Sequence, residues 1–280
     1  EFDQESTWQD EARLMMKNAY LHLTLDQADW NISPTHFQAS SFPAHWQRKI
    51  SVIHDGVDTQ KACPDPSAAS LTLPDGTVLE RGQPIVTFVN RRFEPYRGCH
   101  TFLRALPALQ KECPEARIVI VGETTGVSYG AACADGEWKD KFLAEIEGRY
   151  DPDRVHFTGT LPYQQFIPLL QLSACHVYLT YPFVMSWSLL EAMACGCAVV
   201  GSDTAPVREV IRHGENGLLV DFFSPADLAT AVAELLRDRD RAAAFGVAAR
   251  RTVERTYDLD VCVQRQLSLM DLVASGSISG

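Results

Sequence analysis

The sequence predicts an α/β protein whose core is a doubly wound parallel sheet. From residue 85 onward, short apolar runs bounded by turn residues alternate with helix-like segments. The runs are continuously apolar rather than alternating, which is typical of strands buried on both faces. The connections between runs have room for helices, as right-handed βαβ crossovers require. These three observations favour one sheet with helices on both faces.

The elements of this sheet follow one another along the chain. We expect strands over residues 85–89, 117–121, 155–157, 176–180, 198–201 and 218–220. The intervening helices are expected over residues 99–111, 137–147, 163–171, 188–195 and 206–212. Helical patterns dominate after Ser224, with one helix beginning at Pro225 and another over residues 259–274. We therefore assign residues 84–257 to one domain and residues 258–280 to a C-terminal crossover helix and tail.

The residues before the sheet follow a different pattern. An amphipathic helix is expected over residues 8–28, followed by two short strands. About 60 residues are too few for an independent α/β domain, so we interpret residues 1–60 as the remnant of an N-terminal domain with its junction. Residues 61–83 are rich in Pro, Asp, Ser and Gly and contain the turn signal Pro74-Asp75-Gly76. We expect a linker or a surface excursion there.

Composition and charge argue against several classes of function. Lys and Arg number 25 against 36 Asp and Glu, which gives a net charge of −11, and no basic run occurs. Such a surface repels phosphate backbones, so we expect no nucleic-acid partner. No uninterrupted apolar stretch approaches the ~20 residues that cross a bilayer. The eight cysteines are scattered, and Cys195-Gly196-Cys197 lacks the further ligands of a zinc site, so we expect buried thiols in a reducing, cytoplasmic compartment.

A loop with several arginines follows the first expected strand. Arg91 and Arg97 bracket a Pro-containing turn that opens into a helix N-terminus, a favourable place for an anion. Guanidinium groups offer planar forks of donors that match phosphate oxygens. The same arginines could instead be solvated surface side chains, one of them paired with Glu94. Arg92 is the alternative to Arg91, because the sequence does not decide which of the two points inward.

The loop after the fourth expected strand carries a second group of candidates. Residues 181–188 lead into a helix with Glu191 near its first turn, and Ser186 or Ser188 can cap that helix. A carboxylate such as Glu191 can accept hydrogen bonds from the vicinal diol of a ribose. Alternatively, Glu191 only complements the helix dipole. Aromatic side chains in this loop, Phe183 above all, can belong to the core.

Other motifs carry less information. Gly122 ends the second strand, where a glycine permits close approach of a ligand to the backbone or simply makes a turn. No G-x-G-x-x-G follows a strand, and neither a phosphate-binding G-x-x-x-x-G-K-S/T loop nor a G-x-S-x-G elbow occurs. The two D-x-D patterns, at 151–153 and 238–240, are more typical of turns and caps than of metal sites. We therefore predict no metal and no resident cofactor.

Four segments in this order resemble the C-terminal half of a retaining glycosyltransferase of the GT-B fold, family four of the sequence classification. They are residues 52–58, 91–98, 190–196 and 215–220. Residues 94–98 and 176–183 further resemble a bacterial subset linked to surface polysaccharide assembly. The resemblance covers most of residues 50–222. It implies a Rossmann-like C-terminal domain that binds a nucleoside-diphosphate sugar.

The resemblance also implies roles for individual residues. Arg91 and Arg97 match the two basic positions that hold the donor diphosphate, and Glu191 matches the second glutamate of the family's E-x₇-E pair, which contacts the ribose. Phe183 stands where the first glutamate is expected, so the sugar ring must be held differently. The candidate donor-binding residues are Glu191, Met185, Ser186, Trp187, Ser188, Gly122, Thr160 and Leu161.

The activity that the resemblance implies is metal-independent transfer of a sugar, with retention, to a glycan or glycolipid acceptor such as a lipopolysaccharide precursor. The acceptor would bind mainly to an N-terminal domain, most of which is absent from this sequence. That domain could also contact the inner membrane peripherally. The chain alone is expected to bind donor without transferring it. Two alternatives stay open: a non-catalytic sugar-nucleotide-binding subunit, and an epimerase or hydrolase on the same fold.

Overall fold

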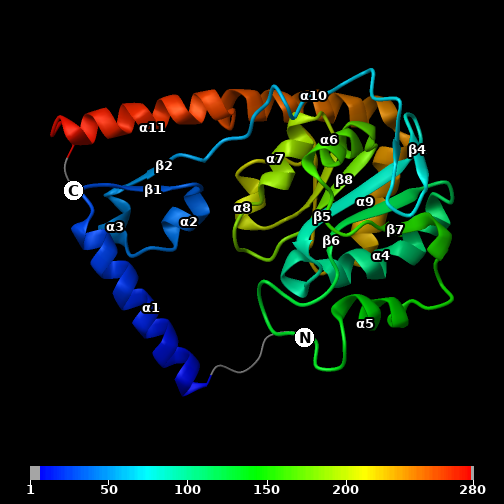
Figure 1. The fold of residues 1–280 in the computed structure, drawn as a ribbon, viewed down its shortest axis with the longest axis horizontal. Coiled ribbons are helices and arrows are strands. Elements are labelled where there is room, and N and C mark those ends of the chain that lie inside the picture. The colour runs from blue at the N-terminus through cyan, green and yellow to red at the C-terminus, as the bar shows by residue number, and fades with distance from the viewer. Residues whose placement is uncertain (1–6, 279–280) are drawn as a thin grey trace. The chain divides into compact units, whose positions relative to one another are not determined.

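The computed structural model describes residues 7–278, which divide into two compact units (Figure 1). The larger unit is Val57–Asp258 and contains the parallel sheet. The smaller unit joins the residues up to Gly56 with those from Leu259 onward. Within residues 7–278, no helix combines the length and the apolar character that a membrane crossing requires.

The smaller unit is mostly helical around one pair of parallel strands. The strands β1 (Asn31–Ser33) and β2 (Ile50–Val52) place Asn31 opposite Ile50. The long helix α1 begins after Thr7, whose hydroxyl accepts the Asp10 N–H while the Asp10 carboxylate accepts the Thr7 N–H. Such a reciprocal capping box fixes the helix start. The helices of this unit are α1 (Trp8–Gln27), α2 (His36–Ser40), α3 (Ala44–Gln47) and α11 (Leu259–Ala274).

The sheet of the larger unit has six parallel strands in the order β10-β9-β8-β5-β6-β7. The strands are β5 (Ile85–Arg92), β6 (Arg117–Glu123), β7 (Val155–Phe157), β8 (Cys175–Tyr178), β9 (Val199–Ser202) and β10 (Leu218–Val220). Three consecutive β6 residues, Ile118, Val119 and Ile120, are at most 1% exposed, which confirms burial on both faces. The chain runs outward from β5 to β7 and then returns to place β8 on the other side of β5. The predicted doubly wound sheet is confirmed.

Helices cover the two faces of this sheet in separate groups (Figure 1). On one face α4 packs against α5 and α9, and on the other α7 packs against α6 and α10. The helices are α4 (Cys99–Glu112), α5 (Trp138–Glu145), α6 (Tyr163–Leu172), α7 (Trp187–Ala194), α8 (Ala205–Arg208), α9 (Pro225–Arg237) and α10 (Arg239–Thr256), with 3₁₀ turns η1 (Pro95–Arg97) and η2 (Pro152–Arg154). The expected helix over 206–212 is shortened to α8, because the buried Asn216 side chain bonds the Arg212 N–H and the Val210 carbonyl.

The segment that we expected to be a linker or a surface excursion contains an antiparallel hairpin. Its strands are β3 (Ser70–Thr72) and β4 (Val78–Glu80), and Pro74-Asp75-Gly76 forms the predicted turn between them. Leu73 and Leu79 are 3% and 0% exposed and belong to the main core. The polar composition of residues 61–83 conceals these leucines, so the sequence pattern shows the turn but not the packing.

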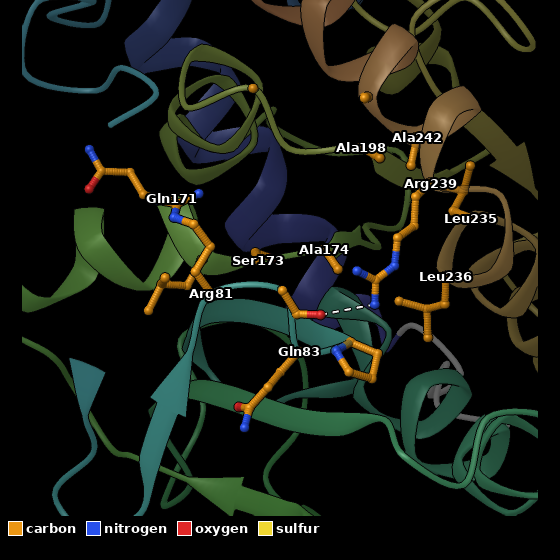
Figure 2. Close-up of a pocket in the computed structure, with 15 residues that line it drawn as sticks. Arg81, Gln83, Gln171, Ser173, Ala174, Ala198, Leu235, Leu236, Arg239 and Ala242 are labelled. Carbon is orange, nitrogen blue, oxygen red and sulfur yellow. Dashed lines mark hydrogen bonds between the residues drawn. The ribbon is translucent and has the colours of Figure 1, made fainter. Parts of the chain in front are cut away.

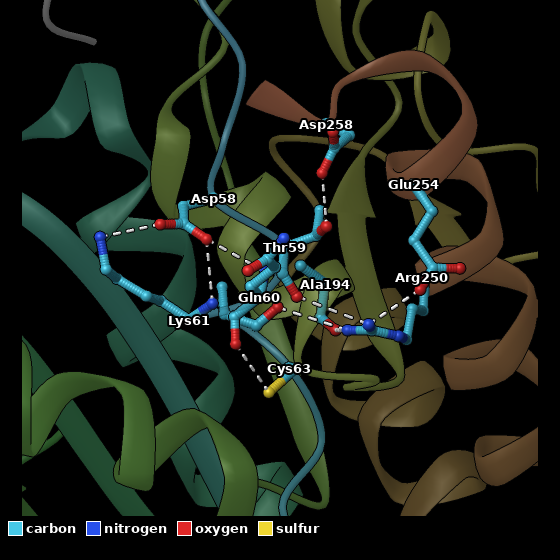
Figure 3. A network of polar contacts seen from close by, with 10 residues as sticks. Asp58, Thr59, Gln60, Lys61, Cys63, Ala194, Arg250, Glu254 and Asp258 are labelled. Carbon is cyan, nitrogen blue, oxygen red and sulfur yellow. Dashed lines mark hydrogen bonds and ion pairs between the residues drawn. The ribbon is translucent and has the colours of Figure 1, made fainter. Parts of the chain in front are cut away.

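The two ends of the larger unit are tied together (Figure 3). The Val57 N–H donates to the Tyr257 carbonyl at 2.8 Å, and the Thr59 hydroxyl donates to the Asp258 carboxylate at 2.5 Å. Arg250 of α10 donates to the carbonyls of Ala62 and Ala194 at 3.3 and 2.5 Å. These contacts close residues 57–258 into one body.

Candidate functional site

The candidate site lies where the carboxyl ends of β5 and β8 are adjacent. Ligands of open parallel sheets bind at such a point, because the connections on its two sides leave in opposite directions and open a crevice. The turn η1 after β5 carries Arg97, and the loop after β8 leads to the start of α7. The two loops meet: Arg97 Nη1 donates to the Val184 carbonyl at 3.3 Å and to Thr180 Oγ1 at 3.5 Å.

The three arginines of the first loop point to different places. Arg97 is half-buried against the loop after β8. Arg92 donates from Nη1 to the Thr125 carbonyl at 2.5 Å and therefore belongs to the loop after β6. Arg91 is exposed. A register shift between Val89 and Arg92 in the pairing of β5 with β6 accompanies this divergence. Bulges re-aim side chains in this way beside ligand sites.

Glu94 does not pair with an arginine among the described residues. Its side chain is 1% exposed, and Oε2 accepts the N–H groups of Ser128 and Tyr129 at 2.5 and 3.0 Å. This carboxylate therefore anchors the loop after β6 to the turn that carries Arg97. The sequence offered no sign of this role, because the partners are 34 and 35 residues away.

The start of α7 is capped from within the site. Ser186 is the N-cap, and its Oγ accepts the Ser188 N–H at 3.3 Å and lies 3.0 Å from Ser188 Oγ. The Ser186 N–H donates to the Tyr178 hydroxyl at 2.7 Å. Burial raises the pKa of Tyr178, and the charge of Arg97 and a side-chain hydrogen bond with it partly oppose that effect. Across residues 7–278 no acceptor takes the N–H groups of Met185 and Trp187.

The side chains at the start of α7 face different environments. Met185 is 4% exposed and packs in the core, whereas Trp187 is 57% exposed. Phe183, which we expected in the core, is half-buried instead. Its ring contacts Tyr129, a residue of the loop after β6 that sequence reasoning did not select.

Glu191 lies in α7 and is half-buried. Burial raises the pKa of its carboxyl group, and a hydrogen bond with the Tyr163 hydroxyl partly opposes that effect. Burial and the Glu191 charge in turn raise the pKa of Tyr163, the first residue of α6. Tyr163 was not among the predicted site residues, since nothing local connects it to Glu191.

The candidates that follow β6 and β7 have structural roles of their own. Gly122 has φ +131°, and a Cβ there would lie 1.8 Å from the Asn90 carbonyl oxygen. The close approach that we expected of a ligand is thus made by the chain itself. Thr160 is exposed and donates to Glu123 Oε1 at 2.8 Å. The Leu161 side chain is buried in the core, so only its backbone can reach a ligand.

Other possible sites differ from this one. Among residues 7–278 no three His, Cys, Asp or Glu side chains are placed to hold a metal ion. Asp151 and Asp238, which begin the two D-x-D patterns, cap η2 and α10. The cavity in Figure 2, about 290 Å³ in volume, opens at the amino ends of the strands, beside Ala174 and Ala198. It therefore lies at the opposite edge of the sheet from Arg97.

Comparison with known families identifies the chain. Residues 73–252 match the family described as glycosyl transferases group 1, and residues 1–62 match the glycosyl transferase family 4 group. The chain belongs to the group 1 glycosyl transferases. This confirms the resemblance inferred from its motifs.

Relatives of this group 1 chain include named enzymes. It is 31% identical over 218 residues to the GDP-mannose-dependent alpha-(1-6)-phosphatidylinositol monomannoside mannosyltransferase of Mycobacterium tuberculosis, covering 75% of this chain and 53% of that protein. It is 29% identical over 212 residues to the D-inositol 3-phosphate glycosyltransferase of Thermobispora bispora, covering 74% and 47%. The chain thus spans about half the length of these relatives.

Solved structures confirm the GT-B type of fold. Anabaena Alr3699/HepE, solved in complex with UDP-glucose, superposes with a TM-score of 0.71 at 19% identity and covers 87% of this chain and 64% of that one. The C-terminal domain of the group 1 protein LpcC from Francisella tularensis has a TM-score of 0.60 at 22% identity, covering 73% of this chain and all of that one.

Proposed function

We propose that this chain is the donor-binding part of a retaining glycosyltransferase that uses a nucleoside-diphosphate sugar and no metal ion. One observation carries the proposal. Arg97 is half-buried at the junction of β5 and β8, next to the start of α7, and no carboxylate among the described residues pairs with it. A cation in such a place favours an anionic ligand.

The diphosphate would lie between Arg97 and the N-terminus of α7. Breaking the sugar–phosphate bond leaves negative charge on the terminal phosphate, and prearranged donors stabilise that charge. The guanidinium group of Arg97 and the N–H groups of Met185 and Trp187 are such donors. Arg91 supplies a second guanidinium from the exposed rim. Attack by the acceptor on the same face then requires only positioning beside the departing phosphate.

The nucleoside would lie toward α6 and α7. Glu191 accepts hydrogen bonds from the ribose hydroxyls, and the Tyr163 hydroxyl orients its carboxylate. Ser186 and Ser188 offer hydroxyl groups to the donor. Gly122 contributes backbone at the end of β6, with Thr160 and Leu161 on the neighbouring loop.

The acceptor is proposed to be a glycan or glycolipid, such as a precursor of lipopolysaccharide or another surface polysaccharide. The mycobacterial relative is named for a phosphatidylinositol mannoside acceptor, which supports a glycolipid. Transfer would take place in the cytoplasm, with peripheral contact at the inner membrane. The proposed donor class is supported by the GDP-mannose in that relative's name and by the UDP-glucose in complex with the Anabaena protein.

One observation favours a second candidate, a non-catalytic sugar-nucleotide-binding subunit. Phe183 stands at the family's glutamate position, and its ring contacts Tyr129. No carboxylate occurs between Tyr181 and Ser188 to hold the sugar. Measurement of donor turnover with and without acceptor distinguishes this candidate, as well as an epimerase or hydrolase, from a transferase.

The experiment has two steps. The 280-residue chain is titrated with UDP-glucose and GDP-mannose in the presence of EDTA, and we expect binding of at least one of them without sugar transfer. The chain extended to the length of its relatives is then supplied with donor and a glycolipid acceptor, and the anomeric configuration of the product is read by NMR. Binding that strictly requires Mg²⁺, or an inverted product, would contradict the proposal.

A further inference from the structure

We propose that the adjoining rings of Tyr129 and Phe183, which we call the aromatic slot, position the Arg97 guanidinium from one side for the donor diphosphate. The inference rests on the proposed function, because it assigns a purpose to the surroundings of the arginine that would bind the diphosphate. It concerns two residues that are positioning groups rather than catalytic ones.

Two adjoining rings lie on one side of the guanidinium. Arg97 Cζ lies 5.7 Å from the centroid of the Tyr129 ring and 5.6 Å from that of Phe183. The two ring centroids are 4.6 Å apart, and their planes are tilted by 58°. A guanidinium within about 6 Å of an aromatic centroid is attracted by the negative face of the ring. The three side chains come from the connections after β5, β6 and β8, so the slot exists only in the folded sheet.

Hydrogen bonds alone hold the guanidinium weakly. The contacts from Nη1 to Val184 and Thr180 measure 3.3 and 3.5 Å, at the long end of the useful range. No carboxylate among residues 7–278 pairs with Arg97, so no ion pair fixes its orientation. The ring faces therefore add to the orientation that these contacts and the Tyr178 hydroxyl give, and they leave the charge uncompensated for an anion.

The slot is fastened to the turn that carries Arg97. The buried Glu94 carboxylate accepts the Tyr129 N–H, and a Cβ at Gly130 would lie 2.7 Å from the ring of Tyr96. On the other side, the Tyr181 N–H donates to the Tyr96 carbonyl at 2.9 Å. Both ring-bearing loops are thus attached to residues 94–97, which is expected of a device that sets the position of Arg97.

The slot gives Phe183 a role in place of the glutamate expected at that position. A carboxylate there would lie close to the guanidinium and compete with phosphate for it. An aromatic ring holds the guanidinium in place without neutralising it. Phe183 is therefore compatible with binding of the diphosphate by Arg97.

The test compares Tyr129→Phe and Tyr129→Leu in the 280-residue chain by calorimetric titration with UDP and GDP, and with UMP and GMP as matched probes that have one phosphate fewer. Tyr129→Phe keeps the ring, and we expect affinity within twofold of the parent. Tyr129→Leu keeps apolar volume but loses the ring face, and we expect affinity for the diphosphate to fall about three- to tenfold. Monophosphate affinity should change less than twofold.

Four further variants make the result specific. Phe183→Leu should behave as Tyr129→Leu does, and Tyr20→Ala, at an exposed aromatic side chain of α1, should change nothing. In an Arg97→Ala background, Tyr129→Leu should have no further effect. The proposal would be overturned if Tyr129→Leu lowered diphosphate affinity as much in the Arg97→Ala background as in the parent. Equal losses of diphosphate affinity in Tyr129→Phe and Tyr129→Leu would also overturn it. If Arg97→Ala loses diphosphate affinity while both leucine variants keep it, the role of the aromatic slot is wrong and the proposed function stands. If the parent binds no diphosphate, the proposed function is wrong as well.

Discussion

The two edges of the parallel sheet use arginine differently. At the amino edge, Arg81 and Arg239 line the cavity of Figure 2 from different sides, and each donates to a backbone carbonyl at 2.9 Å, Ala68 and Gly82 respectively. At the carboxyl edge, Arg97 makes two long contacts and interacts with the Tyr178 hydroxyl. Its guanidinium lies against two adjoining aromatic rings. A cavity such as the one at the amino edge therefore does not by itself mark a ligand site. In the proposed function, the ligand site is marked instead by the half-buried charge of Arg97, which no carboxylate among residues 7–278 pairs with.

The largest expected effect is a loss of stability when Arg250 is replaced. Arg250→Ala removes donors from the carbonyls of Ala62 and Ala194 and leaves them without their charged partner. We expect the free energy of unfolding to fall by about 2–3 kcal/mol, since bonds to charged groups are worth more than neutral ones. Urea denaturation measures this. Arg251→Ala, an exposed neighbour on the same helix, is the control and should shift stability by under about 0.5 kcal/mol.

The next effect concerns binding at the carboxyl edge. Glu191→Gln keeps the shape of the side chain but weakens a charge-assisted hydrogen bond, so affinity for a nucleoside diphosphate should fall by roughly 1–2 kcal/mol. The parent should bind the 2′-deoxy nucleotide more weakly than the ribonucleotide, and the variant should lose that difference. Calorimetric titration of both proteins with both nucleotides measures the coupling. If the parent and the variant discriminate equally between the ribonucleotide and the 2′-deoxy nucleotide, Glu191 does not recognise the ribose.

The pH dependence of stability and of nucleotide affinity separates the effect of Glu191 on folding from its role in ribose binding. Burial raises the pKa of Glu191 above its ordinary value of 4.5, so the folded chain holds this proton to a higher pH than the unfolded chain does. The stability contribution of Glu191 is therefore fully present below pH 4.5 and is lost as the pH rises through the folded-state pKa. Ribose binding needs the charged form, so affinity should increase over the same interval. Denaturation and calorimetry of the parent against Glu191→Gln, between pH 4 and 7, test both slopes.

The smallest effect is expected for Arg239→Ala. This exposed arginine donates to the Gly82 carbonyl at the rim of the amino-edge cavity. Its loss should lower the free energy of unfolding by at most about 1 kcal/mol. Diphosphate affinity should not change. A clear loss of diphosphate binding in this variant would mean that the amino edge, not the carboxyl edge, holds the anion.

The fold was predictable because its signals are local. Continuous apolar runs such as 117–121 identify buried strands, and their spacing identifies crossovers. The hairpin at residues 70–80 escaped prediction because three leucines in a polar segment look like a loop until the core that they fill is known.

The site was predictable only in part. Arg97 and Ser186 stand in recognisable loops and Glu191 in the helix that follows one of them, and the structure brings these segments to one edge. Tyr129 and Tyr163 escaped prediction because each meets its partner through the tertiary fold. Local sequence therefore identifies the charged groups of the candidate site, but not the distant residues that contact them in the folded chain.

Arg97 is proposed to supply the anion-binding charge at the carboxyl edge, and calorimetric titration with UDP and GDP in EDTA tests this most directly. The parent, Arg97→Ala and Arg239→Ala chains are compared. We predict that the parent binds at least one diphosphate, that Arg239→Ala matches it, and that Arg97→Ala loses about 1.5–3 kcal/mol of binding free energy. Full affinity in Arg97→Ala, with or without a loss in Arg239→Ala, would contradict the account.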